Sequence, residues 1–317
     1  MKSVTVFAPA TVANVAVGFD ILGHAIEGVG DEITLERAAA REVVIESIEP
    51  GNSGPSAEEL AQLPRDPARN TATVGILRLI EEQALGHGFR VRLKKGIPLG
   101  SGMGGSAASA VGGVVAANRF LERPLGSEEL LRYALMGEAV ASGAAHPDNA
   151  APCLYGGLVL AHSDLGVVSL PTPPGLLCVL LHPHARLDTR TARGVLGRDV
   201  SLQGHVNQSA KLAGFLAAIF KGDLSLLKRS FHDELIEPQR AHLIPGFEEV
   251  KQAALHAGAL GCSISGSGPS IFAWVAGDAV AARVRDEWMA LLAGRGMHAD
   301  AWTSPIGSRG AAVIEER

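Results

Sequence analysis

The chain is 317 residues long, with 47% hydrophobic and 4% aromatic residues, and its formal net charge is −5. The slight negative charge and the few aromatic side chains exclude a broad basic or base-stacking surface, so we expect no nucleic acid partner. Three widely spaced cysteines form no Cys-x-x-Cys pair, which argues against zinc or redox chemistry and suits the reducing cytoplasm.

The first part of the chain predicts strands and one capped helix. Alternation of apolar and polar residues predicts three strands, over 4–8, 31–37 and 42–49. A loop rich in Pro, Gly and Ser follows over 50–67. The next apolar stripe predicts a helix over 70–84, for which Asn70 is a suitable N-cap.

The stretch over 98–108 reads Pro-Leu-Gly-Ser-Gly-Met-Gly-Gly-Ser-Ala-Ala. An alternating strand is expected before it, over 89–94, and an Ala-rich helix after it, over 106–121. A strand, a glycine loop and a helix start in this order aim backbone N–H groups and the positive helix end at an anion. The pattern therefore predicts a phosphate-binding loop, although a simple turn before a close-packed helix would contain the same glycines.

A carboxylate then occupies an unusual helical position. Ser127 is the expected N-cap of a helix that extends to about residue 141. Glu138 continues the apolar stripe of this helix, where a carboxylate is costly unless it is paired or metal-bound. Together with a hydroxyl at the start of the preceding helix (Ser106), it offers the hard oxygen ligands that Mg²⁺ prefers beside phosphates.

The second half of the chain is expected to form its own domain. The composition changes near 164–175, a continuous apolar strand is expected over 176–181, and a second glycine loop occupies 265–269. Strands mixed with pairs of helices predict an α+β architecture. The segment after Pro305 shows no clear pattern and is expected to be irregular. Glycines and prolines interrupt the long uncharged stretches, so no transmembrane helix and no membrane partner are expected.

Two well-known phosphate motifs fit the glycine loop only in part. Gly100-x-Gly102-x-x-Gly105 has the spacing of the dinucleotide fingerprint, but a helix follows where a second strand ending in an acidic residue is needed. Gly100 and Gly105 also have P-loop spacing, but Ser106 stands where the lysine is required. The loop therefore disfavours a NAD site and a P-loop NTPase.

The glycine stretch resembles the central motif of the GHMP kinases, which include galactokinase, homoserine kinase and mevalonate kinase. The first family motif is similar to residues 9–20 and the third to residues 265–270. The resemblance implies an α+β fold with an N-terminal, ribosomal-S5-domain-2-like ATP-binding domain over 1–165. A C-terminal ferredoxin-like α/β sandwich over 166–317 would complete the substrate site. One departure is Gly105, where the family usually has a serine.

Three further stretches, 146–153, 189–193 and 237–247, resemble the homoserine kinase branch of this family. This resemblance implies ATP-dependent phosphorylation of L-homoserine to O-phospho-L-homoserine in threonine biosynthesis. It also implies Mg²⁺, a homodimer and a cytoplasmic enzyme. The alternatives are another GHMP-type kinase that acts on a different small alcohol, and a non-catalytic nucleotide-binding relative.

The resemblance also assigns the binding residues. Arg193 and Arg240 would bind the substrate carboxylate, since guanidinium groups match its planar geometry. The other substrate contacts would be Asn14, Asp20 and His146, with Asp20 and Asn14 at the ammonium group. Ser106 and Glu138 would bind the metal ion. The implied ATP-binding residues are Asn70, Pro98, Leu99, Gly100, Ser101, Gly102, Met103, Gly104, Gly105, Ser106, Ala107 and Ala108.

Simpler explanations exist for some of these residues. Asn70 fits a plain helix cap, His146 a structural loop residue, and each arginine taken singly a solvated surface charge.

The residues expected to take part in catalysis are Glu138, Asp148, Asn149, Thr189 and Arg193. Relatives that resemble mevalonate kinase use an Asp eleven residues after the metal-binding Glu. Here that position is Asn149, which cannot accept a proton as a carboxylate would, and Asp148 is adjacent. Thr189 is expected near the reacting phosphate or hydroxyl. The resemblance implies phosphoryl transfer without a dedicated base, which suits a loose transition state.

Overall fold

The computed structural model describes residues 1–143 and 146–317, and the strands of these residues form two sheets. The strands of the first sheet are β1 (Ser3–Ala13), β2 (Leu22–Ala38), β3 (Val43–Pro50), β4 (Gly88–Lys95), β5 (Leu158–His162), β6 (Gly166–Leu170) and β11 (Ala312–Glu316). Its order is β11–β1–β2–β4–β3, with β5 on β2 and β6 on β5. The second sheet contains β7 (Leu176–Pro183), β8 (Gly261–Ile264), β9 (Ile271–Ala276) and β10 (Ala299–Pro305), in the order β10–β7–β9–β8.

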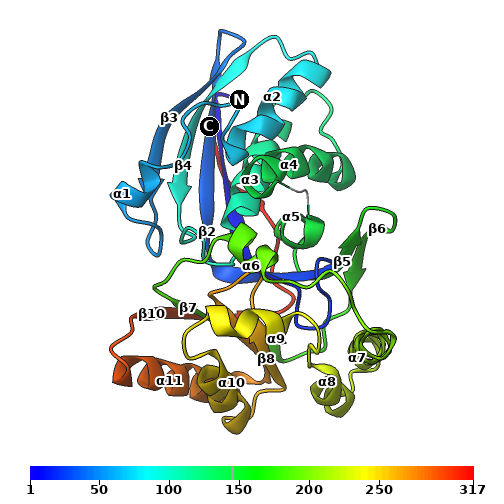
Figure 1. Ribbon diagram of the computed structural model, residues 1–317. Coiled ribbons are helices and arrows are strands. Elements are labelled where there is room, and N and C mark those ends of the chain that lie inside the picture. Colours follow the sequence, from blue (N-terminus) through cyan, green and yellow to red (C-terminus); the bar gives the residue numbers. More distant parts are fainter. Residues whose placement is uncertain (144–145) are drawn as a thin grey trace.

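The helices pack against these two sheets, as Figure 1 shows. In the described part of the chain they are α1 (Ala57–Leu60), α2 (Thr71–Glu82), α3 (Gly105–Asn118), α4 (Ser127–Ser142), α5 (Pro147–Tyr155), α6 (Thr189–Gly194), α7 (Leu202–Lys221), α8 (Leu224–Ser230), α9 (Glu237–Arg240), α10 (Phe247–His256) and α11 (Asp278–Gly294), with a 3₁₀ turn at Ala241–Leu243. None of them is long and apolar enough to cross a membrane.

Strand β4 positions the glycine loop because its side chains alternate as predicted. Phe89, Val91 and Leu93 are buried in the first core, and the residues between them are exposed. Lys95, the last residue of β4, lies on the same inward face as Phe89, Val91 and Leu93 and is 4% exposed. The strand therefore ends with a cation beneath the start of α3.

Small residues let α2, α3 and α4 pack closely behind the loop. A Cβ added at Gly113 of α3 would lie 2.1 Å from the Ala72 carbonyl oxygen of α2. A Cβ at Gly137 of α4 would lie 2.3 Å from the Thr71 carbonyl oxygen. These contacts require glycine, because any side chain would push the backbones apart. The Ala- and Gly-rich composition of α3 thus fixes the separation between the loop and α4.

The second sheet joins the first through a buried aromatic cluster. Trp274 of β9 packs against Phe215 and Phe231, with ring centroids 5.4 and 5.3 Å away. Its indole N–H donates to Nε2 of His24 in β2 over 3.2 Å. Burial lowers the pKa of His24 to about 4, so this histidine is a neutral acceptor. The contact thus links the two sheets through buried side chains.

Most predicted elements are present, and two predictions are wrong. The N-cap of α4 is Gly126, and Ser127 is the first helical residue. The segment after Pro305 is not irregular throughout, since β11 pairs antiparallel with β1. The division into residues 1–165 and 166–317 stays a prediction; β6 still belongs to the first sheet, and β7 begins the second.

Candidate active site

A cavity of about 360 Å³ lies between the glycine loop, α5, α6 and the second glycine loop. Most of the residues singled out from the sequence line it: Asn14, Asp20, Asn70, Pro98, Leu99, Gly100, Ser101, Gly102, Gly104, Gly105, Ser106, Glu138, His146, Asp148, Asn149, Thr189, Arg193 and Arg240. Met103, Ala107 and Ala108 are buried under the loop and do not line the cavity. The structure thus gathers the predicted residues from both halves of the chain.

The glycine loop has a backbone that only glycine adopts easily. Gly100, Gly102 and Gly104 have φ values of +63°, +75° and +69°. Gly104 is the N-cap of α3, which has no side-chain cap among the described residues. The first backbone N–H groups of this 14-residue helix are therefore available to an anion in the cavity.

The second glycine loop holds the first one in place. The Ser265 hydroxyl donates to the Gly102 carbonyl oxygen over 2.8 Å, and the Ser270 N–H donates to the Ser101 carbonyl oxygen over 3.1 Å. A Cβ at Gly102 would lie 2.5 Å from the Ser265 carbonyl oxygen. The two loops, which lie far apart in the sequence, are therefore in direct contact.

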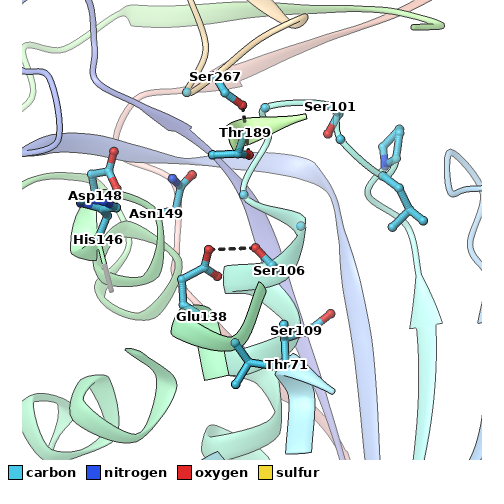
Figure 2. Close-up of a pocket in the computed structure, with 18 of the residues that line it drawn as sticks. Thr71, Ser101, Ser106, Ser109, Glu138, His146, Asp148, Asn149, Thr189 and Ser267 are labelled. Carbon is cyan, nitrogen blue, oxygen red and sulfur yellow. Dashed lines mark hydrogen bonds between the residues drawn. The ribbon is translucent and has the colours of Figure 1, made fainter. Parts of the chain in front are cut away.

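Ser106 and Glu138 form the acidic end of the cavity. The Ser106 hydroxyl donates to Glu138 Oε1 over 3.0 Å (Figure 2). Burial raises the pKa of Glu138, whereas the Ser106 hydrogen bond and the Lys95 charge oppose that rise. A carboxylate and a hydroxyl on two fixed helices fit one side of a Mg²⁺ site, whose other ligands would be phosphate oxygens and water.

A buried ion pair supports the loop from below. The Lys95 ammonium pairs with Asp31, and it also donates to the Gly105 carbonyl oxygen over 2.9 Å and to Ser109 Oγ over 2.7 Å. Asp31 Oδ1 accepts the N–H groups of Gly96 and Ile97. Each charge is thus hydrogen-bonded on several sides, as a buried pair requires.

Asp20 and Arg193 form an ion pair on the opposite side of the cavity. The guanidinium donates to both Asp20 oxygens, over 2.8 and 3.0 Å, and the fork raises the pKa of Arg193. His146 Nδ1 lies 3.7 Å from the same carboxylate. This side of the cavity therefore presents a cation next to an anion.

Arg240 and Asn14 are tied to the second glycine loop. Arg240 donates to the carbonyl oxygens of Ala192 and Gly266, and Asn14 Nδ2 donates to the Gly266 carbonyl oxygen over 2.8 Å. Burial and the neighbouring Arg193 lower the pKa of Arg240. Asn14 has a φ of +71°, and its Oδ1 accepts the Asp20 N–H over 3.0 Å. The strained turn at Asn14 thus orients Asp20 toward the cavity.

Comparison with known proteins identifies the family. Family models match the chain over residues 71–157, for the GHMP kinases N terminal domain, and over residues 215–293, for the GHMP kinases C terminal domain. The chain is 45% identical over 314 residues to a homoserine kinase of Xanthomonas campestris pv. campestris (strain B100), covering 99% of this chain and 95% of that protein. The chain belongs to the homoserine kinase family of the GHMP kinases.

Two further relatives agree with this assignment. A homoserine kinase of Chlorobium phaeovibrioides is 45% identical over 330 residues, covering 99% of this chain and 100% of that protein. The crystal structure of homoserine kinase from Cytophaga hutchinsonii has a TM-score of 0.93 at 43% identity, covering 99% of this chain and 98% of that one. The predicted α+β fold of the GHMP kinases is therefore confirmed.

In this GHMP kinase α5 and α6 contribute three further polar residues to the cavity wall, Asp148, Asn149 and Thr189. Asp148 is 4% exposed, and burial, with Asp20 and Glu138 nearby, raises its pKa to about 7. Asn149 Oδ1 accepts the Thr11 hydroxyl over 2.7 Å. Thr189 Oγ1 lies 3.5 Å from Ser267 Oγ (Figure 2).

Asn70 caps α2 with its whole side chain. Its Oδ1 accepts the Ala72 N–H over 3.0 Å, and its Nδ2 donates to the Pro64 carbonyl oxygen over 2.7 Å. The simpler explanation from the sequence, a helix cap, is confirmed. Asn70 also lines the cavity, and its contact with a bound nucleotide stays a prediction.

Four residues that support the site were not predicted from the sequence: Thr11, Asp31, Lys95 and Ser109. A signal existed for Lys95, because it follows Phe89, Val91 and Leu93 at the same two-residue spacing and therefore points inward. No comparable signal identifies its partner, since Asp31 lies 64 residues earlier in the chain. Thr11 lies within the first family motif but received no role.

Proposed function

We propose that this protein transfers a phosphoryl group from ATP to the side-chain hydroxyl of L-homoserine, giving ADP and O-phospho-L-homoserine for threonine biosynthesis. The observation that carries the proposal is one cavity with two chemically different ends. The start of α3, where no side chain of the described residues binds the backbone N–H groups, suits phosphates, and the Ser106–Glu138 pair suits a metal ion. The Asp20–Arg193 pair suits a zwitterion.

The nucleotide is proposed to bind residues 98–106 and Asn70, largely within the N-terminal half of the chain. Backbone N–H groups of the glycine loop would contact its phosphates, and the Lys95 charge beneath the loop supports this arrangement. Ser106 and Glu138 would hold Mg²⁺, which neutralises charge on the transferred phosphate when it is bound.

The amino acid is proposed to bind where Asp20 and Arg193 now neutralise each other. Its carboxylate would take the donors of Arg193 and Arg240, and its ammonium group would take Asp20 and Asn14. His146, 3.7 Å from Asp20, borders the same space. A substrate lacking either charge would leave Asp20 or the two arginines without an opposite charge on the ligand, which gives the site its selectivity.

Phosphoryl transfer is proposed to proceed by positioning and charge stabilisation. The hydroxyl oxygen of homoserine forms the new P–O bond, the bond to the ADP oxygen breaks, and the hydroxyl proton is lost to water or to a phosphoryl oxygen. Thr189 and Asn149 would contact the reacting groups, and Arg193 would offset developing negative charge. Asp148 lies close by with a pKa of about 7, but it is not required as a base.

The proposal is tested by ADP release with Mg·ATP and, in turn, L-homoserine, L-threonine, mevalonate and galactose. Homoserine should give by far the highest kcat/KM, and removing its amino group should abolish that preference. Turnover of mevalonate or galactose alone would identify another GHMP-type alcohol kinase. No ADP release with any alcohol would identify a non-catalytic nucleotide-binding protein.

A cytoplasmic homodimer is proposed as the working form. Helix α7 supports this proposal, since an exposed face carries apolar residues spaced three, four or seven positions apart: Leu202, Val206, Ala210, Ala213 and Phe220. Large residues lie at the ends and alanines in the middle, so two copies fit antiparallel about a two-fold axis. Light scattering should report a dimer that Phe220→Glu dissociates, whereas Met289→Glu on α11 leaves it intact.

A further inference from the structure

The Asn149 carboxamide is held at one end only. The Thr11 hydroxyl donates to Asn149 Oδ1 over 2.7 Å, and Nδ2 has no hydrogen-bond partner among the described residues. Figure 2 shows Asn149 in the cavity wall, with Glu138, Ser106 and Thr189 around the same space. Because its oxygen accepts the Thr11 hydroxyl, the amide presents its two N–H groups as donors to the cavity.

Thr11 is itself fixed relative to the glycine loop. It is fully buried in β1, and its backbone N–H donates to the Met103 carbonyl oxygen over 3.0 Å. A Cβ at Gly104 would lie 2.1 Å from Thr11 Oγ1 and 2.8 Å from Asn149 Oδ1. The loop therefore lies directly on the Thr11–Asn149 pair. One residue thus sets the geometry of the loop and of Asn149 together.

We infer that Thr11 is a positioning residue that turns the N–H₂ end of Asn149, and not its oxygen, toward the transferred phosphoryl group. The inference rests on the proposed kinase function. Amide N–H donors stabilise the charge on phosphoryl oxygens in the transition state. A reversed amide would place an acceptor oxygen against those anionic oxygens and repel them. Thr11 acts through Asn149 and contacts neither substrate.

A double-mutant cycle tests the inference. Thr11→Val removes the hydroxyl with little change of shape, and we expect kcat to fall about tenfold, with the KM values for ATP and homoserine within about twofold. Thr11→Ser keeps the hydroxyl and should retain kcat within about threefold. In an Asn149→Ala background, where there is no amide to orient, Thr11→Val should change kcat by less than about twofold.

Thr5→Val is the matched control. It removes another β1 hydroxyl, which lies 3.0 Å from Thr34 Oγ1 and does not line the cavity, and it should leave kcat unchanged. The inference is overturned if Thr11→Val lowers kcat equally with and without Asn149. It is also overturned if both KM values rise in step with a loss of kcat and of thermal stability, because that pattern indicates damage to the fold.

A second readout separates this inference from the proposed function. The side-chain amide resonances of Asn149, observed by NMR in ¹⁵N-labelled protein, should shift in Thr11→Val and stay near their wild-type position in Thr11→Ser. Unchanged resonances in Thr11→Val would contradict the hydrogen bond and so overturn the inference. Wild-type protein that releases no ADP with homoserine would overturn the proposed function, whereas the resonances would still test the geometry.

Discussion

The Ser106 hydroxyl on α3 donates to the Glu138 carboxylate on α4 over 3.0 Å. The two helices cannot drift apart independently, because α2 packs closely against both through Gly113 and Gly137. Helix packing therefore sets the distance between the Ser106 hydroxyl and the Glu138 carboxylate before any ligand binds. Preorganisation of this kind is what a metal–phosphate site requires.

Glu138→Gln should abolish turnover while the fold remains intact. The amide has the shape of the carboxylate but lacks the charge that a metal ion needs, so kcat should fall by at least about a thousandfold. Thermal unfolding should show no loss of stability, because burial raises the pKa of Glu138 and the neutral amide avoids that desolvation cost. A variant that kept more than a tenth of wild-type kcat would contradict the metal-binding role.

Asp148→Asn should lower turnover only modestly, by about two- to tenfold. The carboxylate is close to the reacting space, but phosphoryl transfer through a loose transition state needs little help from a base. Steady-state ADP release at saturating substrates measures the effect, with circular dichroism to verify folding. A complete loss of activity in a folded variant would show that Asp148 is the general base.

Asp148 should also make stability depend on pH. Its pKa is raised from 3.8 to about 7 in the folded chain, so the folded state binds an extra proton between these values. Its contribution to the unfolding free energy is present below pH 3.8 and is lost as the pH rises toward 7. Asp148→Asn avoids this loss, so its stability relative to wild type should increase from pH 5 to pH 7, by up to about 1.4 kcal/mol per pH unit. Urea unfolding that gave a constant difference would contradict the raised pKa.

Arg193→Lys should weaken homoserine binding and leave ATP binding alone. Lysine keeps the charge but loses the fork that spans both Asp20 oxygens. We expect the KM for homoserine to rise about 10- to 100-fold and the KM for ATP to stay within about twofold. Arg190→Lys is the control, because Arg190 is an exposed residue of the same short helix. Equal effects of the two variants would show that the helix, and not the guanidinium, matters.

Local patterns in the sequence predict the parts of the site that one element defines. The apolar stripe around Glu138 predicts its burial, and the N-cap preference of asparagine predicts the role of Asn70 at α2. Glycine spacing likewise predicts a turn before α3. In each case the deciding residues lie within a single helix or loop.

Pairs that are distant in the chain could not be predicted from these patterns. Asp20 and Arg193 are 173 residues apart, and the family resemblance alone suggested that they share a site. Strand β11 was missed because its five residues pair with β1 at the other end of the chain. The partner of Lys95 and the φ of +71° at Asn14 likewise depend on tertiary packing.

Gly102 and Gly105 should differ sharply in their tolerance of a side chain. Gly102 has a φ of +75°, and a Cβ there would meet backbone atoms of Ser265 and Gly268 at 2.5 to 2.8 Å. Gly105 has no positive φ, and the nearest atom to its Cβ would be the Cγ2 methyl group of Ile97 at 3.2 Å, with no backbone atom closer than 3.9 Å. Gly102→Ala should therefore lose at least about 2 kcal/mol of stability, whereas Gly105→Ala should change it by less than about 1 kcal/mol.

Gly105→Ser extends this comparison to nucleotide binding. The serine restores the hydroxyl that GHMP kinases usually carry at this position, at the start of α3 and beside Ser106. We expect it to lower the KM for ATP about two- to fivefold, because one more donor faces the phosphates. Gly105→Ala is the control, because it adds the Cβ without the hydroxyl, and it should leave the KM for ATP unchanged. If serine and alanine acted alike, the first residue of α3 would influence ATP only through its backbone N–H.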